Sequence, residues 1–210
     1  MHILPANKEG LRAAIHILRQ GGIVAHATET CYGFACDLTN PEAVEQLFTL
    51  KQRPPNQPVS ALFASIVDAR KYVEWSEKAE ELAKKYLPGP LTIILPLRSD
   101  APAPLFATPQ KLSAISYQLS ATLGIRLSSH PVAQKLVEMF GSPLSTTSAN
   151  LHGKPNTYSV EEILTQFRGM ELQPDLVLDS GTLPRRQPST VVVLGNGNAE
   201  VVRRGGIVLD

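Results

Sequence analysis

Apolar residues recur at helical spacing in several stretches of the chain. Residues 8–20 place four apolar side chains on one face, and Gly21 follows as a helix stop. Asn40 comes directly before a proline and an acidic residue, which is typical of a helix start. The pattern predicts helices over residues 8–20, 40–51, 77–86 and 131–140, with two more that begin after Ser65 and Ser159.

Short apolar runs alternate with these helices along the chain. They predict strands over residues 23–27, 59–63, 91–97, 124–127, 175–179 and 189–194. Residues 195–198 indicate a hairpin turn into a last strand over residues 199–204, and residues 98–112, rich in proline and alanine, indicate a surface loop. Interspersed strands and helices favour a layered α/β fold with a mixed sheet, and we expect a single domain over residues 1–210.

The composition indicates a folded globular protein and does not point to a particular class of binding partner. Of 210 residues, 43% are hydrophobic and 19% are charged, which is enough apolar material for a core. The net charge is +1, without the basic excess of proteins that wrap nucleic acid. Cys31 and Cys36 have neither zinc-site nor redox-motif spacing. The sequence shows no signal-peptide or membrane-span pattern, so we expect a cytoplasmic protein.

The common nucleotide and hydrolase motifs are absent from the sequence. It contains no phosphate-binding P-loop and no dinucleotide-binding Gly-x-Gly-x-x-Gly after a strand. It also lacks the Gly-x-Ser-x-Gly nucleophile elbow and the zinc-binding His-Glu-x-x-His helix. A nucleotide site in this chain must therefore be of a less common kind.

Cations in two clusters are candidates for an anion site. Lys51 and Arg53 lie at the end of the 40–51 helix, and Pro54 pushes Arg53 out of helical geometry. Cations at a helix C-terminus also complement the helix dipole without any ligand, so both interpretations stay open for this pair. Arg126 lies inside an apolar strand and needs a partner, either a carboxylate of the protein or an anion of a ligand.

Small polar residues crowd two further stretches. Residues 27–33 follow a predicted strand and, taken alone, indicate a polar turn. Five of the six residues 145–150 are Ser, Thr or Asn, and a glycine-containing loop follows them. Their hydroxyl and amide groups suit phosphate or ribose, and a hydroxyl-rich turn is the alternative interpretation.

In this order the clusters resemble the YrdC-like family, the threonylcarbamoyl-AMP synthases of tRNA modification. The matching stretches are ATETCYG (27–33), KQRP (51–54) with Pro58, PGPLT (88–92), IRLSSHP (125–131), STTSAN (145–150) with GKP (153–155), PST (188–190) and RRGGI (203–207). Each pattern is short, but together they follow the family's order and span nearly the whole chain.

The resemblance implies a fold, a reaction and a set of partners. The fold is α/β, a single-domain, twisted mixed β-sheet flanked by helices, with a concave basic cavity. Members of the family condense L-threonine, bicarbonate and ATP, with Mg²⁺ accompanying the ATP, into threonylcarbamoyl-AMP and pyrophosphate. Downstream tRNA threonylcarbamoyl transferase proteins then modify an adenosine of tRNA, and weak binding of tRNA or double-stranded RNA is a secondary expectation.

The resemblance also implies roles for individual residues. Lys51 and Arg53 would be catalytic and face the phosphates. The ATP-binding residues would be Arg53, Gln57, Thr122, Asn150, Tyr158 and Arg203. The threonine-binding residues would be Thr30, Arg126, Ser148 and Ser189, and no residue is expected to hold a metal.

Some positions depart from the family pattern. Gln57 replaces a frequent Asn, Leu62 stands where longer members carry a His near threonine, and Tyr158 replaces a small hydroxyl residue. The principal cations remain in place, so the activity stays the expectation. The alternatives are a carbamoyl-adenylate enzyme with the same fold, or an RNA-binding module without adenylation activity.

Overall fold

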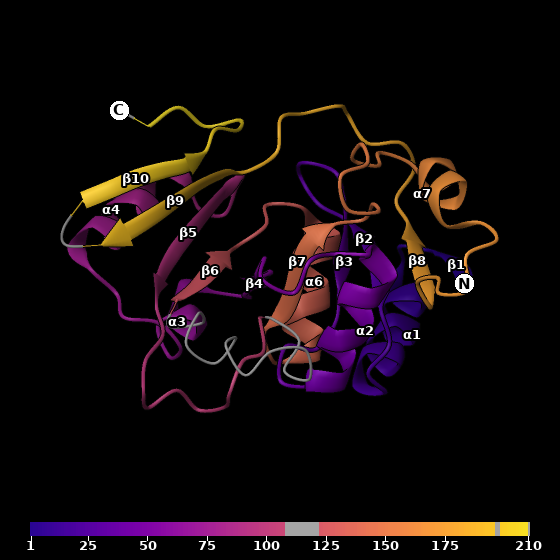
Figure 1. Ribbon diagram of the computed structural model, residues 1–210, viewed down its shortest axis with the longest axis horizontal. Helices are drawn as coiled ribbons and strands as arrows, with labels where there is room; N and C mark the ends of the chain where they lie inside the picture. The colour runs from indigo at the N-terminus through magenta and orange to yellow at the C-terminus, as the bar shows by residue number, and fades with distance from the viewer. Residues whose placement is uncertain (108–121, 196–197, 210) are drawn as a thin grey trace.

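The computed structural model describes residues 1–107, 122–195 and 198–209 and is drawn in Figure 1. Its strands are β1 (His2–Pro5), β2 (Val24–Ala27), β3 (Tyr32–Ala35), β4 (Ser60–Leu62), β5 (Leu91–Pro96), β6 (Thr122–Arg126), β7 (Leu144–Ser148), β8 (Leu176–Asp179), β9 (Thr190–Gly195) and β10 (Asn198–Arg203). They form one ten-stranded sheet in the order β1-β8-β2-β3-β7-β4-β6-β5-β9-β10. Parallel pairs such as β1 with β8 occur beside antiparallel pairs such as β2 with β3, so the sheet is mixed, as the sequence predicts.

The helices agree closely with the sequence pattern. Within the described residues they are α1 (Lys8–Arg19), α2 (Pro41–Lys51), α3 (Ile66–Ala69), α4 (Glu77–Tyr86), α6 (Pro131–Phe140) and α7 (Val160–Phe167). Asn40, Ser65 and Ser159 accept backbone N–H groups from the first turns of α2, α3 and α7. These three side chains are the caps that the sequence predicts, and each satisfies donors that the helix itself leaves unpaired.

The sequence pattern misses β1, β3 and β7. The sequence of β7 is Leu-Ser-Thr-Thr-Ser, which is too polar to suggest an interior strand, yet it lies between β3 and β4. Ser145 is fully buried there because its Oγ accepts the N–H of Cys36 at 2.9 Å. A hydroxyl with a hydrogen-bond partner is tolerated in a core. The predicted loop over 98–112 is described only to residue 107, and residues 196–197 of the predicted hairpin turn also lie outside the described residues.

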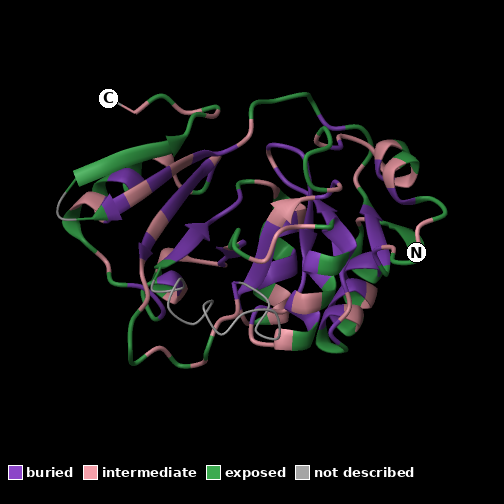
Figure 2. Ribbon diagram, in the orientation of Figure 1, coloured by how far each residue is buried: buried purple, intermediate pink, exposed green. Residues whose placement is uncertain are grey.

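Hydrophobic packing fixes the helices on the sheet. Leu11 of α1, Leu136 of α6 and Leu176 of β8 belong to one buried cluster, and α1 contacts α6. A larger cluster joins α2, α4 and α7 to the strands, and in it the rings of Phe34 and Phe167 meet edge to face at 5.4 Å. Figure 2 shows the buried residues concentrated in the inner strands of the sheet and in the helix faces turned toward them, whereas the outer strand β10 is exposed. In the described part of the chain, no helix is long and apolar enough to cross a bilayer.

A long connection over residues 180–189, here called the strap, joins β8 to β9. These strands are second and ninth in the sheet order, so the strap crosses from one part of the sheet to the other, as the orange to yellow arch in Figure 1 shows. The hydroxyl of Tyr32 secures its start by donating to the carbonyl of Gly181 at 2.8 Å and accepting the N–H of Ser180 at 2.9 Å. The strap therefore leaves β8 in a fixed direction.

Candidate active site

One cavity of about 260 Å³ collects most of the polar clusters that the sequence singles out. Its lining is rich in hydroxyl and guanidinium groups and includes no Asp or Glu among the described residues. The polar residues that line it are Thr30, Arg53, Ser60, Thr92, Arg126, Thr146, Thr147, Ser148, Asn156, Ser189 and Arg203. They come from β4, β5, β6, β7, β10 and the neighbouring loops, so the fold assembles the site from segments that are distant in sequence.

Arg53 is held by the turn that follows α2. Gln52 adopts a left-handed conformation (φ 52°, ψ 40°), which ends the helix and turns the chain before the prolines. The guanidinium then folds back on its own turn, where Nε donates to the carbonyl of Gln57 at 2.7 Å and Nη2 to that of Pro58 at 3.0 Å. The Gln57 side chain is exposed and lies outside the cavity lining, so Gln57 contributes its carbonyl to the site.

Lys51 lies behind the cavity wall and is only 1% exposed. Its Nζ donates to the carbonyl of Ser148 at 2.5 Å, the carbonyl of Asn150 at 2.7 Å and the Asn150 side-chain oxygen at 3.1 Å. Burial lowers the pKa of Lys51 to about 7, with a smaller contribution from Arg53. Three oxygen acceptors match the three N–H groups of an ammonium, so these contacts partly oppose the effect of burial on the pKa.

Asn150 has its own side chain engaged in the same loop. Its Oδ1 also accepts the Ser148 hydroxyl at 2.6 Å, and its Nδ2 donates to the carbonyl of Lys154 at 2.5 Å. The structure therefore brings Lys51, Ser148 and Asn150 together as one hydrogen-bonded unit. Of the three, only Ser148 lines the cavity.

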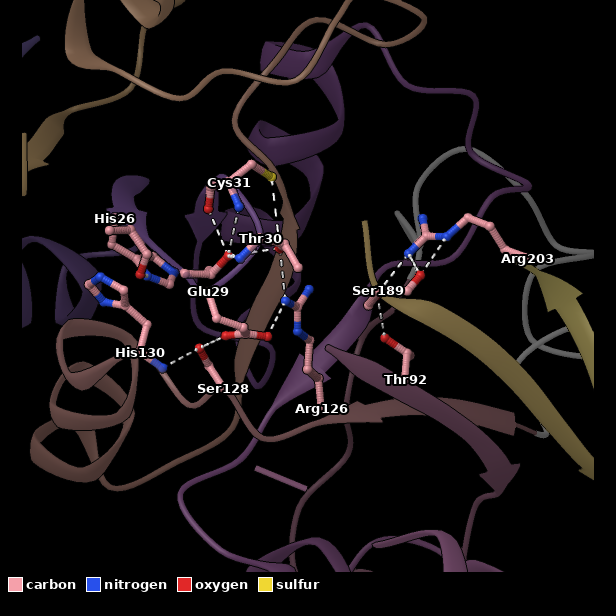
Figure 3. Close-up of polar contacts among 12 residues, drawn as sticks. His26, Glu29, Thr30, Cys31, Thr92, Arg126, Ser128, His130, Ser189 and Arg203 are labelled. Atoms are coloured by element: carbon pink, nitrogen blue, oxygen red, sulfur yellow. Dashed lines mark hydrogen bonds and ion pairs between the residues drawn. The ribbon is translucent and has the colours of Figure 1, made fainter. Parts of the chain in front are cut away.

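Arg126 ends β6 and pairs with a carboxylate of the protein. Its Nη2 lies 2.6 Å from Oε1 of Glu29 and donates to the hydroxyl of Thr30 at 2.9 Å. The hydroxyl of Ser128 donates to the other Glu29 oxygen and accepts the N–H of His130 at 3.2 Å. Figure 3 shows this network as a continuous chain of contacts. Arg126 still lines the cavity, so it has a protein partner and also faces the space where a ligand could bind.

Glu29 remains ionised in this setting. Burial by itself raises its pKa, but the charge of Arg126 and hydrogen bonds from Ser128 and Arg126 outweigh that effect and hold the pKa below its ordinary value. The side chains of Arg126 and Glu29 are 10% and 7% exposed. Nε of Arg126 is also buried, and it has no hydrogen-bond partner in the structure, so the protein alone does not satisfy this guanidinium.

Ser189 and Arg203 form the wall on the other side. Arg203 donates from Nε and Nη2 to the carbonyl of Ser189 and from Nη2 to its hydroxyl, at 2.8 to 3.1 Å. The Ser189 hydroxyl also lies 3.1 Å from that of Thr92 (Figure 3). Gly205 is required beside them, because a Cβ there would lie 2.2 Å from the carbonyl oxygen of Pro188. The end of the strap is thereby locked to β10.

The cations of the cavity repel one another. Burial lowers the pKa of Arg53, and the charge of Arg203 lowers it further. Burial also lowers the pKa of Arg203, and the charge of Arg126 adds to that effect. Like charges held within reach of one another are stabilised by a bound anion, so the arrangement favours an anionic ligand.

Besides Gln57 and Asn150, two more predicted ATP contacts lie outside the cavity lining. Thr122 is exposed at the start of β6, at the opposite end of the strand from Arg126. Tyr158 instead fastens the strap: its hydroxyl donates to the carbonyl of Arg186 at 3.2 Å, and the guanidinium of Arg185 lies 4.8 Å from its ring centre. Asn156, two residues earlier, lines the cavity in its place.

Neither histidine of the network has the properties of an acid–base group. His26 is fully buried, and burial lowers its pKa to about 4, so its ring is neutral at physiological pH. His130 caps α6 by accepting the N–H of Val132 at 3.3 Å. Cys31 lines the cavity, but burial raises the pKa of its thiol and leaves it a poor nucleophile.

Sequence reasoning missed several polar residues of the site. Thr92 stands in the apolar strand β5, and a polar residue in such a strand is the same signal that identified Arg126. Thr146 and Thr147 lie in the stretch that was singled out, without an individual role. Glu29 gave no signal of its own, because the sequence does not show that residues 29 and 126 meet.

The fold and the site together define an α/β protein whose arginine- and hydroxyl-lined pocket lies across a mixed, ten-stranded sheet. The chain belongs to the Sua5–YciO–YrdC family, whose model, described as "Telomere recombination", matches residues 16–205. This result confirms the family and the twisted mixed-sheet α/β fold that the sequence motifs predict.

Individual relatives agree with this assignment. A threonylcarbamoyl-AMP synthase from Vibrio cholerae is 34% identical over 186 residues, which cover 87% of this chain and 92% of that protein. The solved structure of Pyrococcus abyssi Sua5 complexed with L-threonine superposes with a TM-score of 0.82 at 30% identity, covering 98% of this chain and 56% of that one. The structure of Escherichia coli YciO has a TM-score of 0.79 at 28% identity, covering 97% and 94%.

Proposed function

We propose that this protein is an L-threonylcarbamoyladenylate synthase. It would condense L-threonine, bicarbonate and ATP into threonylcarbamoyl-AMP and pyrophosphate, which makes it a nucleotidyltransferase acting in the threonylcarbamoyladenosine modification of tRNA. The observation that carries this proposal is the convergence of Arg53, Arg126 and Arg203 on one cavity that has no acidic lining residue among those described. All of the reactants in the adenylation step carry negative charge, and such a site stabilises them.

The Arg126 end of the cavity is the proposed threonine site. The guanidinium of Arg126 would bind the substrate carboxylate beside the Thr30 hydroxyl, and Ser148 and Ser189 offer further hydroxyl groups in the same cavity. The complex of Pyrococcus abyssi Sua5 with L-threonine supports this class of ligand, since that structure superposes over nearly all of this chain. Leu62 is buried in a hydrophobic cluster and so supplies no polar contact to the amino acid.

The Arg53 and Arg203 end is the proposed triphosphate site. Both guanidinium groups are anchored by backbone carbonyls, so they are positioned before a ligand arrives. Lys51 and Asn150 would act by holding Ser148 in place. The carbamate formed from threonine and bicarbonate would attack the α-phosphorus, and pyrophosphate would leave into the same positive field.

Magnesium would enter with ATP as part of the substrate. The described residues contain no group of three or more His, Cys, Asp or Glu side chains that could hold a metal. The proposal therefore assigns no described residue as a metal ligand. A cytoplasmic location, transfer of the product to tRNA by downstream proteins and weak RNA binding complete the proposal.

Pyrophosphate release tests the proposed reaction. The purified protein is incubated with ATP, Mg²⁺, bicarbonate and L-threonine, and each component is then omitted in turn. The proposal expects release only when all are present. Release that continues without threonine would contradict the proposal, and release that instead requires an added carbamoyl donor such as carbamoyl phosphate would point to a carbamoyl-adenylate enzyme. Salt-sensitive RNA retention without any release would point to an RNA-binding module.

A further inference from the structure

We propose that Glu29 is a specificity-determining residue that reserves the Arg126 end of the cavity for a zwitterionic amino acid and keeps phosphate groups away from it. The inference rests on the proposed function, because it concerns how one cavity keeps an amino acid and a triphosphate apart.

The cavity has two ends that differ in charge. At one end, Arg53 and Arg203 form no ion pair with any described Asp or Glu, and their hydrogen bonds go to neutral groups. At the other end, Arg126 is paired with Glu29 at 2.6 Å in a buried contact. The first end therefore carries net positive charge, while the second is close to neutral.

This difference in charge would direct the phosphate groups and the amino acid to different ends of the cavity. A phosphate group brings only negative charge, so beside the Arg126–Glu29 pair its attraction to the arginine is offset by repulsion from the carboxylate. An α-amino acid brings one negative and one positive charge, so the Arg126–Glu29 pair opposes its binding far less than it opposes the binding of phosphate. Glu29 itself lies outside the cavity lining, and it acts through Arg126 and through the field that it contributes.

Further contacts hold the Glu29 carboxylate in position. Its second oxygen accepts the Ser128 hydroxyl, and that hydroxyl is in turn tied to the backbone N–H of His130 at the start of α6. The carboxylate therefore cannot swing away from Arg126 when a phosphate approaches. Repulsion by a fixed charge is an effective way to reject a competing ligand.

Calorimetric titration with L-threonine, with and without inorganic phosphate, tests the inference. In the wild-type protein, phosphate should leave the affinity for threonine unchanged. In Glu29→Gln, which keeps the side-chain shape but not its charge, phosphate should compete and weaken the apparent threonine affinity about tenfold. Glu138→Gln, a neutralised carboxylate on the surface of α6, is the matched control and should behave like the wild type.

Two further variants separate charge from folding. Glu29→Asp keeps the charge and should retain resistance to phosphate. Direct titration with inorganic phosphate should reveal stronger binding in Glu29→Gln than in Glu29→Gln/Arg126→Met, since the gained affinity depends on the unpaired arginine.

Phosphate that competes with threonine in the wild-type protein would overturn the inference, even if Glu29→Gln were too unstable to purify. Equal phosphate insensitivity of the wild type and Glu29→Gln would also overturn it. These titrations require no turnover, so they remain distinct from the pyrophosphate assay. Failure of the wild-type protein to bind threonine would contradict the proposed function. The direct titration of the variants with phosphate would still test whether the charge of Glu29 keeps phosphate away from Arg126.

Discussion

The Nζ atom of Lys51 lies 2.5 Å from the carbonyl oxygen of Ser148, and this contact ties the end of α2 to the end of β7. The two residues are 97 positions apart in the sequence. The buried side chain of Lys51 therefore holds the polar stretch that contains Ser148 in position by hydrogen bonds. Arg53, two residues after Lys51, reaches the cavity itself, so the two cations of one motif have different structural positions.

Removing the Lys51 ammonium should damage both stability and activity. Lys51→Met keeps most of the side-chain volume but removes a hydrogen-bond donor from three buried oxygens, which we expect to cost about 2–4 kcal/mol of unfolding free energy. Urea denaturation measures that change, and pyrophosphate release should be lost in the same variant. An unfolding midpoint equal to that of the wild type would contradict the burial argument.

Arg53→Ala is the matched comparison. The Arg53 side chain is partly exposed and bonds only to carbonyls of its own turn, so its loss should cost at most about 1 kcal/mol of stability. Because it lines the cavity, pyrophosphate release should nevertheless fall by at least about a hundredfold. Wild-type turnover in this variant would contradict a role in the reaction and would support the alternative, in which Arg53 only complements the dipole of α2.

The titration of Lys51 gives stability a specific dependence on pH. Burial lowers its pKa to about 7 in the folded protein, whereas an unfolded lysine has an ordinary pKa of about 10.4. Between these values the unfolded chain binds a proton that the folded protein does not, so this group makes the folded state more stable as pH rises through the window. Urea unfolding at pH 7 and pH 9 should show the increase in wild type and a smaller one in Lys51→Met. Parallel changes in the two proteins would rule out Lys51 as the source.

Tyr158 provides a test of the strap. Because its hydroxyl bonds to the carbonyl of Arg186 and lies outside the cavity lining, Tyr158→Phe should change the KM for ATP by no more than about twofold. Tyr158→Ala also removes the ring beneath Arg185, and it should increase proteolytic cleavage within residues 181–187. A tenfold rise in KM for Tyr158→Phe would instead support the direct ATP contact that the family resemblance implies.

The sequence predicts the helices well because their start signals are local. Asn40, Ser65 and Ser159 each act on backbone groups within a few residues, and the structure confirms all three caps. It predicts β7 poorly because the suitability of Ser145 for the core depends on the N–H of Cys36, more than a hundred positions away. No local pattern contains that information.

The candidate site likewise has a part that could be predicted from the sequence and a part that could not. Arg126 could be identified from its own strand, since a cation among apolar residues needs a partner. Which partner it has could not be deduced, and the structure supplies Glu29, from the turn before β3. The sequence left open a protein carboxylate or a ligand anion, and the structure shows the carboxylate while leaving Arg126 in the lining of the cavity.

Identification of the product tests the central claim most directly. The protein is incubated with ATP, Mg²⁺, L-threonine and isotopically labelled bicarbonate, and the nucleotide products are separated and analysed by mass spectrometry. The proposed function predicts an adenylate that contains threonine and one labelled carbon. Its appearance should match the release of pyrophosphate in amount. An adenylate that lacks threonine or the label, or release of pyrophosphate with no such adenylate, would contradict it.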